Sequence, residues 1–181
     1  MKSSTHPRRQ SPRLPTFDYS SNGAYFVSAC VQNREPLLGT LEQEIVKHSS
    51  FGAIVETAWF DLTNHYPHIE LDAFIIMPDH IHGIIWLHDM PVTIGDGLRP
   101  SPTPSPTPSP TPSPMRHGLT EIVRALKSFS ARRINEARGT QGQPFWQRGF
   151  YDHIVRLEND LEDIRQYILE NPRRASLKGL S

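Results

Sequence analysis

The sequence has very little cysteine and no long apolar run. Among its 181 residues only Cys30 is a cysteine, so no disulfide can form within the chain. A lone thiol in an apolar segment is typical of a reducing compartment, and we expect Cys30 to be a core residue. No stretch of about 18 or more apolar residues occurs, and the first residues lack the apolar region of a signal peptide. We therefore expect a cytoplasmic protein with no membrane partner.

The chain also lacks net charge, with 19 Lys and Arg residues against 19 Asp and Glu residues. Neutrality by itself argues against a nucleic-acid partner, but the two signs are unevenly distributed. Most basic residues lie after residue 115, whereas acidic residues dominate between residues 19 and 115. A basic face on the C-terminal half is therefore compatible with a neutral chain.

Proline is concentrated in one place. From Pro100 to Pro114 every second residue is proline and the others are Ser or Thr, so no regular hydrogen-bonded element can form there. The tract is typical of an extended spacer in a tolerant loop, and a ligand for a proline-binding domain is the alternative. Length and 36% hydrophobic content predict one folded domain. We expect it at residues 19–175, interrupted by a disordered insertion at 91–117, with a tail at 176–181.

Residues 1–18 are predicted to form a flexible basic arm, because Lys and Arg stand there among Ser, Thr and Pro. The arm is either a phosphate-contacting tail or an inert frayed terminus.

Hydrophobic periodicity predicts strands at residues 24–31, 69–77, 80–87 and 151–156. Apolar residues at spacings of three and four predict helices at residues 50–64 and 119–138. In the second of these helices Ile122, Leu126 and Phe129 are expected to pack inward. A last helix is expected to start at Asn159, a good N-cap, and to end at Asn171, because Pro172 disfavours the helical conformation before it. The order is strand, helix, two strands, helix, strand and helix.

Two histidines open the third predicted strand, in the segment Asp-His-Ile-His-Gly at 79–83. Side chains alternate along a strand, so His80 and His82 present their imidazoles on the same face. A lone His-x-His is often no more than a pair of half-buried polar residues. Packing alone, however, does not call for two imidazoles on an Ile-rich strand, where each needs a polar partner. The pattern indicates half of a metal site.

The predicted helix at 119–138 carries the densest basic cluster, and an aromatic segment follows it. Such charges are usually a solvated helix face, and the aromatic side chains of a loop usually pack beneath it. The alternative is a DNA-binding surface with phosphate-contacting cations and a base-stacking ring. The candidate DNA-binding residues are Arg124, Lys127, Arg132, Arg133, Trp146 and Arg148.

On the last predicted helix, Tyr167 and Asn171 are four residues apart and therefore lie on one side of it. Tyr167 is next to the apolar stripe, so it can reach the sheet. A tyrosine in this position is ordinarily a rim residue with a buried ring and a wet hydroxyl. A catalytic tyrosine is the alternative.

Three segments together resemble a known family. They are Met-Pro-Asp-His-Ile-His-Gly at 77–83, Phe-Trp-Gln-Arg-Gly-Phe-Tyr-Asp-His at 145–153 and Tyr-Ile-Leu-Glu-Asn-Pro at 167–172. In this order they resemble the single-tyrosine HUH transposases (IS200-like), specifically the REP-associated tyrosine transposases. The resemblance runs from about Gly23 to Arg174, and the proline tract is no part of the family pattern.

The resemblance implies an α+β fold, a ferredoxin-like or RRM-like sandwich with an antiparallel four-stranded sheet (βαββαβ) and a C-terminal tyrosine-bearing helix. It also implies that His80 and His82 bind a divalent metal, Mg²⁺ or Mn²⁺, and that Tyr167 is the nucleophile. The third ligand would be Asn171, where many relatives have Gln. The implied substrate is single-stranded, hairpin-forming repeat DNA, and the implied assembly is a monomer or homodimer.

The implied chemistry is metal-assisted transesterification through a 5′-phosphotyrosyl intermediate. A bound cation would polarise the scissile phosphate, and two imidazoles suit Mn²⁺ at least as well as Mg²⁺. An ordinary tyrosine is a poor nucleophile at neutral pH unless its surroundings favour the phenolate.

Two other functions remain open from the residues. Histidine-triad nucleotide hydrolases also carry alternating histidines, but they need a third histidine where Ile84 stands. A non-catalytic RRM-like RNA-binding module needs exposed aromatic residues on its central strands, where this sequence has mostly isoleucine.

Overall fold

The computed structural model describes residues 18–89 and 117–177. The expected basic arm, the proline-rich insertion and the expected tail lie almost entirely outside these residues. Only the first two residues of the expected tail are described, and they belong to the last helix, which runs to Leu177.

The described chain contains six strands, four α-helices and a short 3-10 helix, η1. In chain order they are β1 (Gly23–Cys30), η1 (Gln32–Arg34), β2 (Gly39–Glu42), β3 (Ile45–His48), α1 (Ser50–Phe60), α2 (Leu62–His65), β4 (Ile69–Met77), β5 (His80–Leu87), α3 (Leu119–Arg138), β6 (Tyr151–Val155) and α4 (Glu158–Leu177). Among the described residues, no helix has the length and apolarity needed to cross a membrane.

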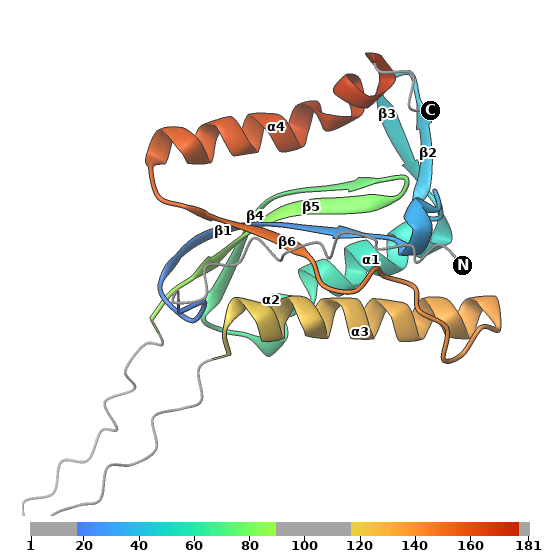
Figure 1. The fold of residues 1–181 in the computed structure, drawn as a ribbon, viewed down its shortest axis with the longest axis horizontal. Helices are drawn as coiled ribbons and strands as arrows, with labels where there is room; N and C mark the ends of the chain where they lie inside the picture. Colours follow the sequence, from blue (N-terminus) through green and yellow to red (C-terminus); the bar gives the residue numbers. More distant parts are fainter. Residues whose placement is uncertain (1–17, 90–116, 178–181) are drawn as a thin grey trace, which may run out of the picture.

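Four strands form the main sheet in the order β4-β5-β1-β6, and all neighbouring pairs are antiparallel. Helices α1 and α2 lie in the connection from β1 to β4, and α3 lies in the connection from β5 to β6. In the sheet, β5 lies between β1 and β4, and β1 lies between β5 and β6. Helices α1, α2 and α3 cover one face of the sheet, and α4 covers the other (Figure 1). The expected α+β fold, with a four-stranded antiparallel sheet and a C-terminal helix, is confirmed.

The two faces of the sheet bury cores of different size. The larger core lies between the sheet and α1 and α3, where Tyr25, Trp59, Ile85 and Leu126 are almost fully buried. The smaller core lies beneath α4 and consists of Ala24, Phe26, Ile84, Leu161 and Ile168. Because this second core is small, polar and aromatic side chains occupy the rest of the α4 face.

Local signals explain the ends of two helices. Ser49 precedes α1 with extended backbone, and its hydroxyl accepts hydrogen bonds from the amides of Phe51 and Gly52, both at 3.2 Å. This is the N-cap arrangement that satisfies free amides of a first turn. Gly139 ends α3 in the left-handed conformation, with φ of 65°.

Four sequence-based expectations are wrong in detail. The helix expected at residues 50–64 is divided into α1 and α2. Phe129 is 46% exposed rather than packed inward, and Cys30 is only half-buried. The last helix starts at Glu158 rather than at an Asn159 cap, and the amide of Leu161 donates to the Leu157 carbonyl as in a first helical turn.

The helix also does not end before Pro172. It runs through the proline to Leu177, so the proline only removes one donor inside a helix that tertiary contacts maintain. Figure 1 shows that α4 changes direction near its C-terminal end, as expected of a helix that contains a proline.

Candidate active site

The two histidines lie side by side at the start of β5, on the face of the sheet that α4 covers. Cys30 and Ser28 on β1 are their partners across the strand pair. The Nε2 atoms of His80 and His82 are 3.1 Å apart, as the alternation of side chains along a strand predicts. Two imidazole nitrogens are therefore directed at the same point.

Asp79, in the turn before β5, fixes the orientation of His80. Its carboxylate is 2.5 Å from His80 Nδ1, and its other oxygen accepts from Arg34 at 3.2 Å. Burial alone raises the pKa of Asp79, but the hydrogen bond to His80 and the charges of His80 and Arg34 outweigh burial and hold that pKa below its usual range. A carboxylate on Nδ1 leaves Nε2 as the free ligand atom, which is the usual outer-shell arrangement of a metal-binding histidine.

His82 is a buried neutral imidazole, only 7% exposed. Burial, helped by the nearby His80 and Arg34, lowers the pKa of His82 from 6.5 to about 3. Within the described residues its Nδ1 atom is buried and has no hydrogen-bond partner. The neutral imidazole is the form that binds metals, and with its proton on Nδ1 it would offer the lone pair of Nε2, the atom that faces His80.

Helix α4 brings Tyr167 and Asn171 to the histidines. The Tyr167 ring is centred 5.4 Å from the His82 ring, and the Phe26 ring lies 6.2 Å from Tyr167 and 5.3 Å from His82. Tyr167 is 38% exposed, so its side chain is open to a substrate, whereas Asn171 is buried. The expected placement of both residues opposite the histidine pair is therefore present in the fold.

A cavity of about 650 Å³ joins these residues. It is lined by side chains from the loop after β1, the β4–β5 turn, β5 and α4, including His80, His82, Tyr167 and Asn171 together with Arg34 and Arg174. Arg34 and Arg174, from opposite ends of the described chain, thus face the same space.

Sequence reasoning missed the two arginines of this cavity. Arg34 is paired with Asp79, and the Arg174 guanidinium lies over the Tyr167 ring at 5.7 Å. Arg174 is seven residues after Tyr167, hence two turns further along the same side of α4. A helix that ends at Asn171, as expected from the sequence, does not include Arg174 and so does not predict that the two residues share a side. No local signal in the sequence distinguishes Arg34.

An ion pair holds α4 against the sheet. Asp72 on β4 accepts from Arg165 Nη2 at 2.6 Å and from its Nε at 3.1 Å, and Trp86 Nε1 donates to the same carboxylate at 3.1 Å. The hydrogen bond to Arg165, against the opposing effect of burial, lowers the pKa of Asp72. The pair fixes the helix two residues before Tyr167 and six before Asn171, so it sets where both reach the sheet.

The predicted DNA-binding residues lie elsewhere. Arg124, Arg132 and Arg133 are exposed on α3, which covers the sheet face opposite the histidines, and Arg148 is exposed in the loop that follows. Lys127 is bound to the backbone, because its ammonium donates to the carbonyls of Gln147, at 2.8 Å, and Gly149.

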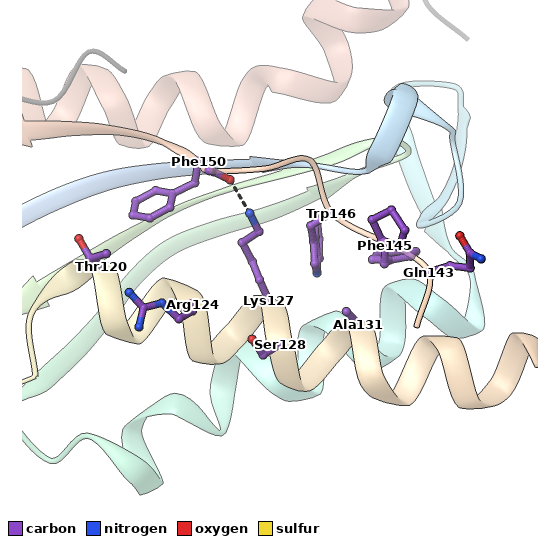
Figure 2. A pocket seen from close by; sticks show the side chains of 11 residues that line it. Thr120, Arg124, Lys127, Ser128, Ala131, Gln143, Phe145, Trp146 and Phe150 are labelled. Atoms are coloured by element: carbon purple, nitrogen blue, oxygen red, sulfur yellow. Dashed lines mark hydrogen bonds between the residues drawn. The ribbon is translucent and has the colours of Figure 1, made fainter. Parts of the chain in front are cut away.

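The predicted base-stacking role of Trp146 is wrong. Its ring is 6% exposed and its Nε1 donates to the buried Ser130 hydroxyl at 3.0 Å, so it is a core residue with a satisfied polar atom. Figure 2 shows the cavity of about 390 Å³ between α3 and the segment 143–150, with Lys127 reaching from the helix toward that segment.

The donor set beside the cavity fits a divalent cation in part. Among the described residues, no three His, Cys, Asp or Glu side chains are grouped as metal ligands. His80 and His82 supply two nitrogens, and the Asn171 amide, which lines the same cavity, is a candidate oxygen donor. Water and phosphate oxygens would complete such a site.

Comparisons with known proteins show similarity to one family over part of the chain. The sequence model of the family described as "Transposase IS200 like" matches residues 112–171, which include Tyr167 and Asn171. An uncharacterized protein of Haemophilus influenzae is 31% identical, over 91% of this chain and 88% of its own length.

One solved structure shares the fold, and a second is less similar. The structure of a REP-associated tyrosine transposase bound to a REP hairpin superposes with a TM-score of 0.53 at 19% identity, covering 84% of this chain and 68% of that one. A candidate transposase of Deinococcus radiodurans R1 gives a TM-score of 0.48 at 19% identity, covering 88% and 96%. The family match covers residues 112–171, including most of the tyrosine helix, and the described chain shares its fold with a REP-associated tyrosine transposase: in this part of its sequence and in its fold, the chain is similar to the IS200-like transposases.

Proposed function

We propose that this protein is a transposase that cuts and rejoins single-stranded DNA by transesterification, with Tyr167 as the nucleophile. The observation that carries the proposal is the common cavity of His80, His82 and Tyr167, which belong to elements distant in the sequence. A tyrosine on a helix surface has no structural need to face two imidazoles, one of them buried. The partly exposed Tyr167 hydroxyl, by contrast, is where a nucleophile must be to meet a phosphate.

In the proposed reaction the Tyr167 phenolic oxygen attacks the scissile phosphorus and releases its proton to solvent. The bond from phosphorus to the 3′-oxygen breaks, and this oxygen takes up a proton and leaves as a free 3′-hydroxyl. The 5′ end of the downstream strand stays on Tyr167 as a phosphodiester. A 3′-hydroxyl then attacks the same phosphorus and restores the tyrosine, so strand joining needs no energy-rich cofactor.

The other residues of the cavity have two proposed roles, phosphate binding and metal binding. Arg174, above the Tyr167 ring, and Arg34, across the cavity, are positioned to bind the phosphate whose charge increases as the tyrosine attacks. We propose that His80, His82 and Asn171 hold Mg²⁺ or Mn²⁺, with Asp79 orienting His80 through its Nδ1. When bound, the cation supplies Lewis-acid polarisation of the phosphate oxygens.

The proposed substrate is hairpin-forming repeat DNA. The support is the likeness in fold to the transposase that was solved with a REP hairpin. The RRM-like alternative is not favoured, because α4 covers the sheet face on which such modules stack bases, and Phe26 at its centre is buried. The histidine-triad alternative lacks its third histidine, since Ile84 is a fully buried core residue.

A denaturation-resistant protein–DNA adduct tests the nucleophile. Incubation of the full chain with labelled single-stranded hairpin DNA and Mn²⁺ should give such an adduct, and Tyr167→Phe should abolish it. Tyr151→Phe, on β6, is the matched control and should retain the adduct. An adduct that survives in Tyr167→Phe and disappears in Tyr151→Phe would overturn the assignment.

Removal of the cation tests the metal. EDTA should abolish adduct formation and Mn²⁺ should restore it, because the phosphate needs charge neutralisation. His80→Ala should give the same loss while the thermal unfolding temperature and most DNA binding are retained. Cleavage that persists in EDTA would eliminate the metal from the mechanism.

A further inference from the structure

The sheet face that carries the active site extends beyond α4 to the edge strand β6. In the strand register, Ser28 on β1 is opposite both His82 on β5 and Tyr151 on β6. These three side chains therefore share one face and form a row across the strands. Neighbouring strands are about 4.8 Å apart, so the Tyr151 backbone is roughly 10 Å from that of His82.

Aromatic rings connect Tyr151 to the proposed nucleophile. The Tyr151 and Phe26 rings form an edge-type contact with centroids 6.2 Å apart, and the Phe26 ring also contacts the rings of His82, at 5.3 Å, and Tyr167, at 6.2 Å. Phe26 is buried, whereas Tyr151 is 47% exposed. The row of His82, Ser28 and Tyr151 thus ends in the exposed ring of Tyr151. One aromatic residue, Phe26, links that ring to His82 and Tyr167 in the cavity.

Charged side chains line the cavity and continue along α4 beyond it. Arg34 and Arg174 line the cavity itself. On α4, Asp163 is four residues before Tyr167 and is exposed, so the helix carries a carboxylate on the same side one turn earlier. Phosphate is therefore favoured beside Arg34 and Arg174, which lie in the cavity, rather than beside Asp163.

We propose that Tyr151 stacks on an unpaired base adjacent to the scissile phosphate and so positions the DNA strand for attack by Tyr167. Single-stranded nucleic acid binds to proteins through successive base–aromatic stacking beside cations that follow the backbone. An exposed ring at the edge of the sheet, next to a phosphate site, meets both requirements. This inference rests on the proposed function, because it places the base relative to the phosphate that Tyr167 attacks.

Substitutions that separate the ring from its hydroxyl test the inference. Tyr151→Ala removes the stacking surface and should weaken binding of a single-stranded oligonucleotide about tenfold, within the range of a lost base stack. Tyr151→Phe keeps the ring and should bind like the parent. Phe129→Ala is the matched control, since that ring is similarly exposed, at 46%, but lies on α3 across the sheet.

Two further readouts distinguish stacking from a structural role. The salt dependence of binding should keep the same slope in Tyr151→Ala, because no phosphate contact is lost, and should become shallower in Arg174→Ala. A fluorescent 2-aminopurine, placed beside the cleavage position mapped with the parent protein, should be quenched by the parent and by Tyr151→Phe but not by Tyr151→Ala.

Equal affinity of Tyr151→Ala and the parent, or quenching that persists without the ring, overturns the inference. The failure of the proposed function looks different, because the parent protein itself would then form no covalent adduct. If no adduct forms, 2-aminopurine is moved along the oligonucleotide in binding assays, and the absence of any ring-dependent quenching at every position rejects the stacking role.

Discussion

At the scale of single residues, the histidine motif includes Gly83, a position where the opposite face of the sheet leaves no room for a side chain. A Cβ atom at Gly83 would lie 2.4 Å from Trp59 Cη2, on the face opposite the histidines. Trp59 is fully buried and stacks on Phe74 at 4.3 Å, so it has no room to retreat. Gly83→Ala should therefore lower the free energy of unfolding by about 1–3 kcal/mol, as overpacking does. Urea unfolding measures this loss.

The double variant Gly83→Ala/Trp59→Phe identifies the cause. A smaller ring makes room for the methyl group, so the two substitutions together should cost less than the sum of their separate costs. Additive costs would show that the Trp59 contact is not what requires glycine.

His82 should make the metal-free protein sensitive to acid. Its folded-state pKa of about 3 is below its ordinary value of 6.5, so between these values the unfolded chain binds more protons. The contribution of neutral His82 to the free energy of unfolding is therefore present above pH 6.5 and is lost as the pH falls toward 3. Between pH 7 and pH 5 the loss should be about 2 kcal/mol, measured by urea unfolding in EDTA. His82→Gln should lack this part of the pH dependence, and an unchanged dependence would contradict the assignment.

The sequence predicts some site residues better than others, for physical reasons. Strand alternation places His80 and His82 on one face, and helix spacing places Tyr167 and Asn171 on one side of a helix. That the two pairs belong to one site is implied only by the family resemblance, because no local pattern fixes where the helix packs. Trp146 is misjudged because its burial depends on Ser130 and the underside of α3, which no local pattern reveals. Arg34 reaches the cavity only through the fold of the loop after β1.

At the scale of elements, the position of α4 determines whether Tyr167 meets the histidines. The Asp72–Arg165 pair is the strongest polar link between this helix and the sheet among the described residues. Arg165→Gln should cost about 1–2 kcal/mol of stability, less than a buried pair would, because the arginine is partly exposed. It should also slow adduct formation, because α4 loses its anchor beside the nucleophile.

Arg173→Gln is the control on the same helix. That side chain is 68% exposed and reaches Glu44 only at 4.0 Å, so its loss should change stability by less than about 0.5 kcal/mol. If both substitutions had equal effects on unfolding and adduct rate, Asp72 would not be the anchor.

Elements with strong local signals are predictable, and those that depend on context are not. The strands β4 and β5 match the expected residues 69–77 and 80–87, because long apolar runs flank a Pro-Asp turn. The hairpin of β2 and β3 was not expected, because its turn places Gln43 and Glu44 at positive φ without glycine or asparagine. The helix beyond Pro172 was missed because packing outweighs a local preference.

At the scale of the whole molecule, one histidine joins the two chain segments that flank the proline-rich insertion. His68 is buried, its carbonyl accepts from the His88 amide at 2.9 Å, and its Nε2 bonds to the His117 carbonyl at 2.9 Å. The chain therefore leaves β5 and returns to α3 at nearly the same point. Any loop long enough to connect the end of β5 to the start of α3 is therefore compatible with the fold.

Deletion of residues 100–114 should consequently leave the domain intact. Twelve residues would remain between residues 89 and 117, more than this gap requires, and shortening a loop costs little or even lowers the closure entropy. The unfolding temperature should change by no more than a few degrees, and the Tyr167 adduct should form at the parent rate, because the cavity lies on the face away from α3. The matched comparison is His68→Ala in the full chain, which removes the side-chain bond to His117 and should destabilise more than the deletion does. A deletion variant that is unfolded at 25 °C would show that the tract contributes to the fold.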